Sequence, residues 1–306
     1  MMRHIIMLFS LVCGFPVQAQ HDFGKSAYKV KKPLTHIYAE KDGDSLYADI
    51  YSPDNTARDR PVFVFMHGGG FSKYSPRQEE VVKLSEMAAS YGYVAIPVSY
   101  RLTRKGKSFG CDCEATEKMN TFKMAVEDLF DALRYIVDHK EELGIDPGRI
   151  ILGGSSAGAE AVLSAAYNRD LLLDNASAYD DIRFSGVLSL AGALPDVRYI
   201  TAENAIPAVF FHGMDDDLVP YATASHHYCG SKEPGYLILD GPESIVKRLK
   251  NLNVSYMLNS YEQSRHELAG VRFGSMDMVF DYFNNVFLGG KQVQIERVFP
   301  KNRKKP

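Results

Sequence analysis

No run in the 306-residue sequence approaches the roughly 20 consecutive apolar residues that a membrane-spanning helix needs. Positive charge is not in excess either, because the formal net charge is −3, and composition therefore gives no electrostatic case for nucleic acid as a partner. Internal repeats and low-complexity linkers are also missing. These absences argue against a transmembrane segment and a repeat array, and they favour one large globular domain.

The N-terminus has the pattern of a secretory signal peptide. Arg3 gives a basic start, residues 5–12 form an apolar core, and residues 17–19 fit a small-x-small cleavage site. We therefore expect an exported chain, either periplasmic or secreted. Lipoprotein anchoring through Cys13 is the alternative, but Ser10 stands where a lipobox has leucine.

Cysteine is scarce, and removal of this leader would leave only Cys111, Cys113 and Cys229. An odd count in an exported protein allows one disulfide at most and a free thiol. A Cys111–Cys113 bridge would close a strained, very small loop, so pairing of Cys229 with either of the others is favoured. No histidine joins this group at zinc-finger spacing, and we expect no metal site.

The remainder of the chain alternates between strand and helix patterns. Strands are expected at 34–39, 45–51, 61–66, 93–98, 150–152, 185–190, 208–211 and 254–258, and helices at 78–91, 118–143, 159–166, 242–252 and 275–287. This alternation predicts an α/β fold: a mostly parallel central sheet with helices on both faces. The expected segments are a signal peptide (1–19), a flexible lead-in (20–33), one domain (34–288) and a basic C-terminal tail (289–306).

A glycine-flanked serine joins the strand at 150–152 to the helix that follows it. The stretch Gly154-Ser-Ser-Ala-Gly158 matches G-x-S-x-G, and strand, G-x-S-x-G and helix in this order are typical of a nucleophile elbow. The central residue is Ser156, not Ser155. The turn is so tight that the positions on either side need glycine, and the helix N-terminus favours developing negative charge at the serine.

A second glycine-rich turn, His67-Gly-Gly-Gly70, follows the strand at 61–66. No Lys-Ser/Thr comes after it, which excludes a P-loop, and it lacks the later glycine of a dinucleotide fingerprint. Glycines let the backbone itself approach a substrate. We therefore expect amide groups of Gly69 and Gly70, with that of Ala157 in the elbow, to form an oxyanion hole.

The order of His-Gly-Gly-Gly, G-x-S-x-G, an aspartate and a histidine resembles the α/β-hydrolase fold. It is most similar to the esterase branch, which includes hormone-sensitive-lipase-like enzymes and exported feruloyl or acetylxylan esterases. The resemblance implies Asp216 as the acid, from the pattern His-Gly-x-x-Asp that begins at His212, and His266 as the base after the last strand. The alternatives are His226 or His227 for the base and Asp196 for the acid, while Asp215 and Asp217 are expected to be solvated neighbours or loop caps.

The same resemblance implies a serine carboxylesterase without a cofactor. Little chain is left for a lid between the elbow and the acid, and the extra material, residues 222–241, follows the acid. An open site favours bulky or polymer-borne esters over long-chain lipid, and export favours carbohydrate-linked acetyl or feruloyl esters or other short-chain esters. The candidate pocket walls are aromatic: Phe71, Tyr100, Phe109 and Tyr221. The competing functions are a prolyl-peptidase-like serine peptidase and a non-catalytic binding protein on the same fold. A monomer and a dimer are both compatible with the sequence.

Overall fold

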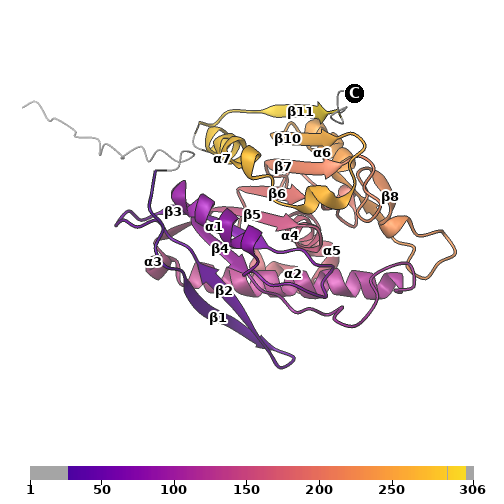
Figure 1. Ribbon diagram of the computed structural model, residues 1–306, viewed down its shortest axis with the longest axis horizontal. Coiled ribbons are helices and arrows are strands. Elements are labelled where there is room, and N and C mark those ends of the chain that lie inside the picture. The colour runs from indigo at the N-terminus through magenta and orange to yellow at the C-terminus, as the bar shows by residue number, and fades with distance from the viewer. Residues whose placement is uncertain (1–26, 288, 301–306) are drawn as a thin grey trace, which may run out of the picture.

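The computed structural model describes residues 27–287 and 289–300, and within them a nine-stranded sheet crosses the molecule (Figure 1). Its spatial order is β1-β2-β4-β3-β5-β6-β7-β10-β11. The strands are β1 (Leu34–Lys41), β2 (Asp44–Ile50), β3 (Arg60–Met66), β4 (Val94–Val98), β5 (Ile145–Ser155), β6 (Gly186–Leu190), β7 (Ala208–Gly213), β10 (Tyr256–Tyr261) and β11 (Gln294–Phe299). The β1–β2 hairpin is antiparallel and joins β4 antiparallel, whereas every other neighbouring pair is parallel. The predicted fold class, an α/β-hydrolase-like sheet, is confirmed.

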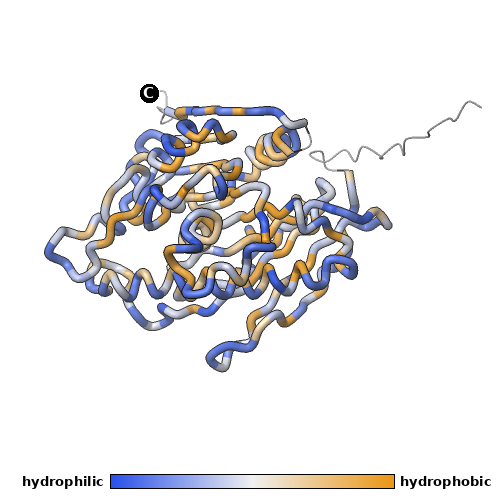
Figure 2. Tube along the Cα trace, turned by 180° about the vertical axis from the view of Figure 1, so that it is seen from behind, coloured by the Kyte–Doolittle hydropathy of each residue, from blue (hydrophilic) through white to orange (hydrophobic). Residues whose placement is uncertain are grey.

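Helices cover both faces of this sheet. They are α1 (Glu79–Ser90), α2 (Ala115–Asp138), α3 (Lys140–Leu143), α4 (Ala157–Tyr167), α5 (Arg169–Leu172), α6 (Pro242–Asn251) and α7 (Phe273–Phe287). In β3, Val62 and Val64 belong to the core cluster that includes residues of α2, α4 and α6, while Phe63 and Phe65 belong to the cluster that includes residues of α1 and α7. Figure 2 shows the apolar residues concentrated in the central strands and the hydrophilic ones in the outer loops. A strand buried on both faces explains the continuous apolar run of the sequence.

The long helix expected at 118–143 is divided. It begins earlier, at Ala115, and ends at Asp138, after which α3 forms one further turn. The side chain of His139 bonds the carbonyl oxygen of Tyr135 through Nδ1 at 2.8 Å, and the backbone amide of His139 bonds the same oxygen. This shared acceptor accompanies the break, and Gly144 in the left-handed region ends α3.

Both edges of the expected domain extend further than the sequence indicated. The strand β11 lies within the range expected as a tail and pairs in parallel with β10. Part of the expected flexible lead-in is also attached, since the amide of Tyr28 donates to Ser90 and that of Lys31 to Ser52. The predicted signal peptide and Cys13 lie outside the described residues. Among the residues described, no helix is long and apolar enough to cross a membrane.

Residues 222–241, predicted as extra material after the acid, contain a small two-stranded sheet. Its strands are β8 (Thr223–Ser225) and β9 (Ile238–Asp240), which pair antiparallel, and a short 3₁₀ helix, η3 (His226–Tyr228), follows β8. The segment therefore has its own backbone hydrogen bonds, and it contributes to the site described next.

Candidate active site

Ser156 lies on the turn between β5 and α4, in a conformation that few side chains adopt. Its φ is +49° and its ψ is −120°. Strained backbone of this kind costs about 1–3 kcal/mol and persists where its surroundings fix it. A Cβ on Gly154 would lie 2.3 Å from the Gly158 carbonyl oxygen, and one on Gly158 would lie 2.2 Å from that of Met66. Both positions therefore require glycine, as the sequence predicted.

The structure brings the predicted serine, histidine and aspartate into one hydrogen-bonded chain. Oγ of Ser156 lies 2.7 Å from Nε2 of His266. Nδ1 of His266 lies 2.8 Å from Oδ2 of Asp216 on its other side. The three residues follow the ends of β5, β10 and β7, so parallel strands of one sheet deliver them to the same edge. This arrangement can remove a proton from the serine and stabilise the resulting imidazolium.

Asp216 is buried, and its carboxylate is fully occupied. Oδ1 accepts hydrogen bonds from the amides of Leu218 (2.9 Å) and Val219 (3.0 Å). Oδ2 faces His266 and also lies 3.3 Å from Nε2 of His212. Burial alone would raise the pKa of Asp216, but the hydrogen bonds and charges of His212 and His266 outweigh it and hold the pKa well below its ordinary value. The side chain is therefore an anion at neutral pH.

The opposite balance acts on His266. Burial would lower its pKa, but the hydrogen bond to Asp216, the charge of that carboxylate and the more distant charges of Glu160 and Asp217 raise it above its ordinary value. A base with a raised pKa accepts the serine proton more readily, provided that it is neutral at the start.

The loop that carries His266 is attached to both neighbouring loops. Ser155 Oγ donates to the carbonyl oxygen of Ala269 at 2.7 Å, at the end of the 3₁₀ helix η4 (His266–Ala269). The amide of Asp215 donates to Ser264 at 3.0 Å. A Cβ on Gly213 would lie 2.3 Å from the carbonyl oxygen of Ser264, so the two loops need glycine there. Sequence reasoning set Ser155 aside as the non-central serine and missed this contact, for which the sequence offers no signal.

The predicted oxyanion donors line the cavity next to Ser156. Gly69 (φ +113°) and Gly70 (φ +60°) adopt left-handed backbone, which their lack of Cβ permits. Among the described residues, no hydrogen-bond acceptor meets the amide of Gly69 or Gly70. The carbonyl oxygen of Gly69 accepts from the amide and hydroxyl of Ser72 instead. Ala157 is the first residue of α4, so its amide has no partner within the helix.

His67 supports this glycine-rich loop from beneath. Its Nδ1 lies 2.7 Å from the carbonyl oxygen of Gly68, and its ring stacks on Tyr100 at 4.5 Å. The Tyr100 hydroxyl donates to the His67 carbonyl oxygen at 2.8 Å. Burial lowers the pKa of His67 to about 4, so it is neutral at physiological pH. His67 therefore braces the glycine-rich turn without taking part in proton transfer at Ser156.

The other predicted alternatives lie apart from the hydrogen-bonded chain. Asp196 pairs with Arg198 at 2.6 Å, and Asp217 pairs with Arg265 at 3.0 Å. His226 and His227 line the cavity, but neither bonds Ser156. Burial, followed by the charge of His226, lowers the pKa of His227 to about 3.

A cavity of about 610 Å³ opens over Ser156. Of the four predicted aromatic walls, only Phe109 lines it. Phe71 and Tyr100 pack beneath the cavity instead, and the hydroxyl of Tyr221 bonds Ser260. Residue type alone could not distinguish an aromatic side chain that lines the cavity from one that packs beneath it, because both kinds lie near the same loops.

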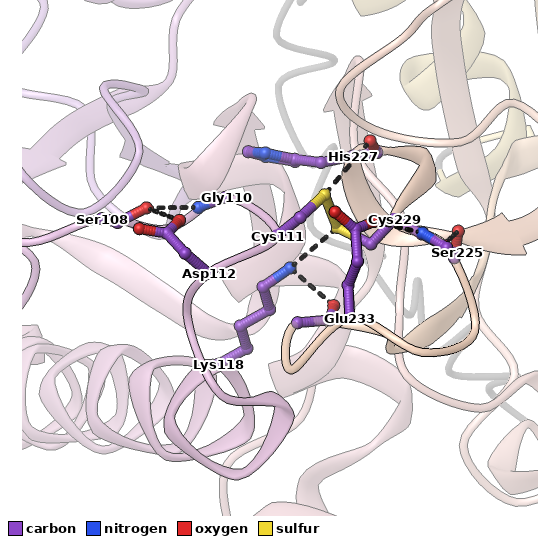
Figure 3. Close-up of a disulfide and its surroundings, with 11 residues drawn as sticks. Ser108, Gly110, Cys111, Asp112, Lys118, Ser225, His227, Cys229 and Glu233 are labelled. Atoms are coloured by element: carbon purple, nitrogen blue, oxygen red, sulfur yellow. Dashed lines mark hydrogen bonds between the residues drawn. A yellow bond between two sulfur atoms is a disulfide. The ribbon is translucent and has the colours of Figure 1, made fainter.

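A disulfide joins the two loops that supply one side of this cavity. Cys111 pairs with Cys229, one of the two pairings expected (Figure 3). Cys113 is a buried free thiol. Beneath the bridge, the amino group of the buried Lys118 donates to the carbonyl oxygen of Gly235 at 2.9 Å. The loop that carries Phe109 is thereby fixed to the segment that carries His226 and His227.

Among the described residues, one group of side chains lies close enough together to bind a metal ion. It consists of Cys111, Cys229 and Glu233. Both sulfur atoms belong to the disulfide, so the group offers only the carboxylate of Glu233 as a ligand.

Comparisons with known proteins find similarity to esterases and other hydrolases. The BD-FAE family model matches residues 48–193, just under half of the chain, a range that includes the glycine-rich loop and the elbow. A phenmedipham hydrolase from Pseudarthrobacter oxydans is 31% identical over 132 residues, which are 43% of this chain and 25% of that protein. Carboxylesterase 3B from Mus musculus is 28% identical over 256 residues, 80% of this chain and 39% of that protein. The chain thus spans well under half the length of these relatives.

The solved structure of Thermogutta terrifontis esterase 2 is similar in fold. Its TM-score is 0.60 at 18% identity, with 83% of this chain and 92% of that chain covered. Similarity at this level of identity supports the shared architecture, and the site's chemistry depends on the residues described above.

Proposed function

We propose that this chain, which has the fold of an α/β-hydrolase, is a serine carboxylesterase. Ser156 is the nucleophile, His266 the general base and Asp216 the acid that orients and stabilises the imidazole. The observation that carries the proposal is the unbroken series of contacts from Ser156 through His266 to Asp216, at 2.7 and 2.8 Å. The esterase and hydrolase names of the relatives support the same reaction class.

In the proposed reaction, His266 removes the proton of Ser156 as its Oγ attacks the ester carbonyl carbon. The oxyanion forms beside the amides of Ala157, Gly69 and Gly70, each such donor being worth about 3–4 kcal/mol of barrier. His266 then gives its proton to the departing alcohol, which leaves an acyl group on Ser156. Water, activated by the same histidine, releases the acid and restores the hydroxyl.

For the substrate, we propose short-chain esters, including acetyl or feruloyl groups carried on carbohydrate. The support is the wide cavity over Ser156 and its mixed lining of glycine backbone, Phe109 and histidines. A binding protein on the same fold would have no need for the complete set of contacts at Ser156.

We also propose that the protein works in an oxidising compartment, as an exported enzyme does. The Cys111–Cys229 disulfide supports this, because such bridges persist outside the reducing cytosol. The signal-peptide pattern of residues 1–19 is the second support.

The test is hydrolysis of p-nitrophenyl acetate and butyrate, followed by acetylated xylo-oligosaccharides and methyl ferulate. We expect turnover by the native protein and a burst of p-nitrophenol equal to the enzyme concentration, since the acyl-enzyme accumulates. Ser156→Ala should abolish both. The exposed Ser177→Ala is the matched control and should leave the rate unchanged. Absence of turnover on every ester would refute the proposed function, and activity of Ser156→Ala would refute the mechanism.

A further inference from the structure

A carboxyl group that the proposed mechanism does not use lies one helical turn below the nucleophile. Glu160 is in the first turn of α4, and its amide donates to the carbonyl oxygen of Ser156 at 2.9 Å. This hydrogen bond places Glu160 one helical turn from the elbow that carries Ser156. Both line the cavity, although the Glu160 side chain is only 3% exposed. Glutamate is rarely buried to this degree unless it has a partner.

The partner is incomplete. Nε2 of His226 lies 3.3 Å from Oε1 of Glu160, a contact between the two groups that lacks hydrogen-bond geometry. Within the described part of the chain, neither Oε1 of Glu160 nor Nδ1 of His226 has a hydrogen-bond partner. Buried polar atoms in native proteins are nearly always satisfied by protein, water or ligand. Two such atoms, one from α4 and one from η3, therefore lie beside the cavity with bonding capacity unused.

Two phenylalanine rings and the ring of His227, at 4.2 Å, pack against His226. Phe109 meets the ring of His226 edge-on at 5.1 Å, and Phe122 meets it at 6.1 Å. Aromatic carbon can satisfy neither a carboxylate nor an imidazole nitrogen as a hydrogen-bonding partner does. Both residues line the cavity, and a substrate bound there is the polar partner that we consider for them.

The chemistry of the pair favours a neutral hydroxyl over an ammonium group. A hydroxyl can donate to the carboxylate oxygen of Glu160 and can also bond the free nitrogen of His226. A positive charge is already present nearby, because the buried Lys118 interacts electrostatically with Glu160. A cationic ligand would meet this ammonium, whereas a hydroxyl adds no charge.

We propose that Glu160 and His226 form a polar subsite that binds a hydroxyl group of the ester substrate. This inference rests on the proposed esterase function and adds a specificity element to the same site. A sugar that forms the alcohol part of the ester presents such a hydroxyl, and so does a hydroxylated aromatic acyl group. The subsite discriminates against the deoxy analogue, because that analogue leaves both polar atoms desolvated and unpaired.

The test compares paired esters that differ by one hydroxyl. One pair carries it on the alcohol side, a monoacetylated methyl xyloside and its deoxy analogue. The other carries it on the acyl side, methyl 4-hydroxycinnamate and methyl cinnamate. The quantity measured is the ratio of kcat/KM for the hydroxylated ester to that for its partner. We expect this ratio to be at least ten for the native enzyme in one pair, which identifies the side that enters the subsite.

Glu160→Leu and His226→Leu should each lower that ratio at least fivefold. The ratio cancels any effect that Glu160 exerts on all substrates through the pKa of His266. Glu86→Leu, the same change at an exposed position of α1, is the control and should leave it unchanged. Thermal melting establishes that each variant is folded.

Two results would overturn the subsite: a native ratio below ten in both pairs, or a fall of less than fivefold in folded variants. The first needs no variant, so it decides the matter even if both substitutions prevent folding. Either result would leave the esterase proposal intact as long as p-nitrophenyl acetate is hydrolysed, whereas loss of all ester hydrolysis would count against the proposed function itself.

Discussion

Replacement of Asp216 by asparagine is the most informative single change, because the surrounding donors dictate how the new amide must lie. The position of Oδ1 faces the amides of Leu218 and Val219, both of which need an acceptor. The asparagine oxygen must take that place, and its NH₂ group must therefore face His266 Nδ1. Facing a donor, Nδ1 becomes the acceptor and the proton of the neutral ring moves to Nε2. Nε2 then donates toward Ser156 and cannot accept its proton.

The expected fall in activity has two causes. The variant loses the correct tautomer of His266, and it loses the negative charge that lies 2.8 Å from the imidazolium. In a well-studied serine protease the equivalent change lowers kcat about 10⁴-fold, which corresponds to ~5.5 kcal/mol of barrier. We expect a fall of about 10³- to 10⁴-fold in kcat/KM for p-nitrophenyl acetate. Folding should be preserved, because the two backbone donors keep an acceptor.

The assay is a pH–rate profile combined with thermal melting. Native activity requires neutral His266, so the rate should rise with pH through a pKa above 6.5. In Asp216→Asn the raising partner is lost and burial remains, so the pKa of the imidazole should fall and the weak residual activity should begin at lower pH. Asp217→Asn is the control, since Asp217 is half exposed, its pair with Arg265 is worth at most ~1 kcal/mol of stability, and its charge raises the pKa of His266 less than that of Asp216 does. Activity of Asp216→Asn within tenfold of native, in a folded protein, would refute the reasoning.

Three further changes test the supports of the site. Ser155→Ala removes the 2.7 Å bond to Ala269 and should cost about 1 kcal/mol of stability and several-fold in kcat, measured by urea unfolding and steady-state kinetics; an unchanged kcat would mean that the contact does not position His266. Gly158→Ala places a Cβ 2.2 Å from the carbonyl oxygen of Met66 and should destabilise the fold by about 1–3 kcal/mol or more, and a melting temperature equal to native would contradict that close contact. Cys229→Ser opens a disulfide with a sequence separation of 118 and should lower the free energy of unfolding by about 2–4 kcal/mol relative to the oxidised native protein, as reduction of the native protein should also do. A variant as stable as the oxidised native protein would show that the loops hold together without the bridge.

Periodicity was sufficient for the parts of the fold that are buried. The apolar run before His67 predicts β3, and the helical spacing of 78–91 predicts α1, because burial on both faces or on one stripe leaves a direct mark on the sequence. Strands at the edge of the sheet have a weaker hydrophobic pattern. β11 is half exposed along its length and carries charged residues, so its alternation resembles that of a polar tail.

At the candidate site, local pattern predicts residues whose neighbours in sequence fix their geometry. Ser156 and the glycines of both turns belong to this kind, since close backbone approach permits no other residue. Contacts between distant segments are not predictable in this way. The bond from Ser155 to Ala269 spans 114 residues, and the contact from Glu160 to His226 joins a helix to a segment whose sequence indicated only irregular structure.

The segment at 222–241 explains how this chain forms a closed wall with little cap material. It follows the acid loop directly, and the amide of His227 donates to the carbonyl oxygen of Leu218, so the position of Asp216 and that of the wall are coupled. The Cys111–Cys229 bridge holds the segment against the loop of Phe109. Pairing of β8 with β9 gives it internal hydrogen bonds, which a polar loop of this length otherwise lacks. A change in the disulfide should therefore alter the choice between ester substrates more than the rate with p-nitrophenyl acetate, since the nucleophile and its base are held by the sheet.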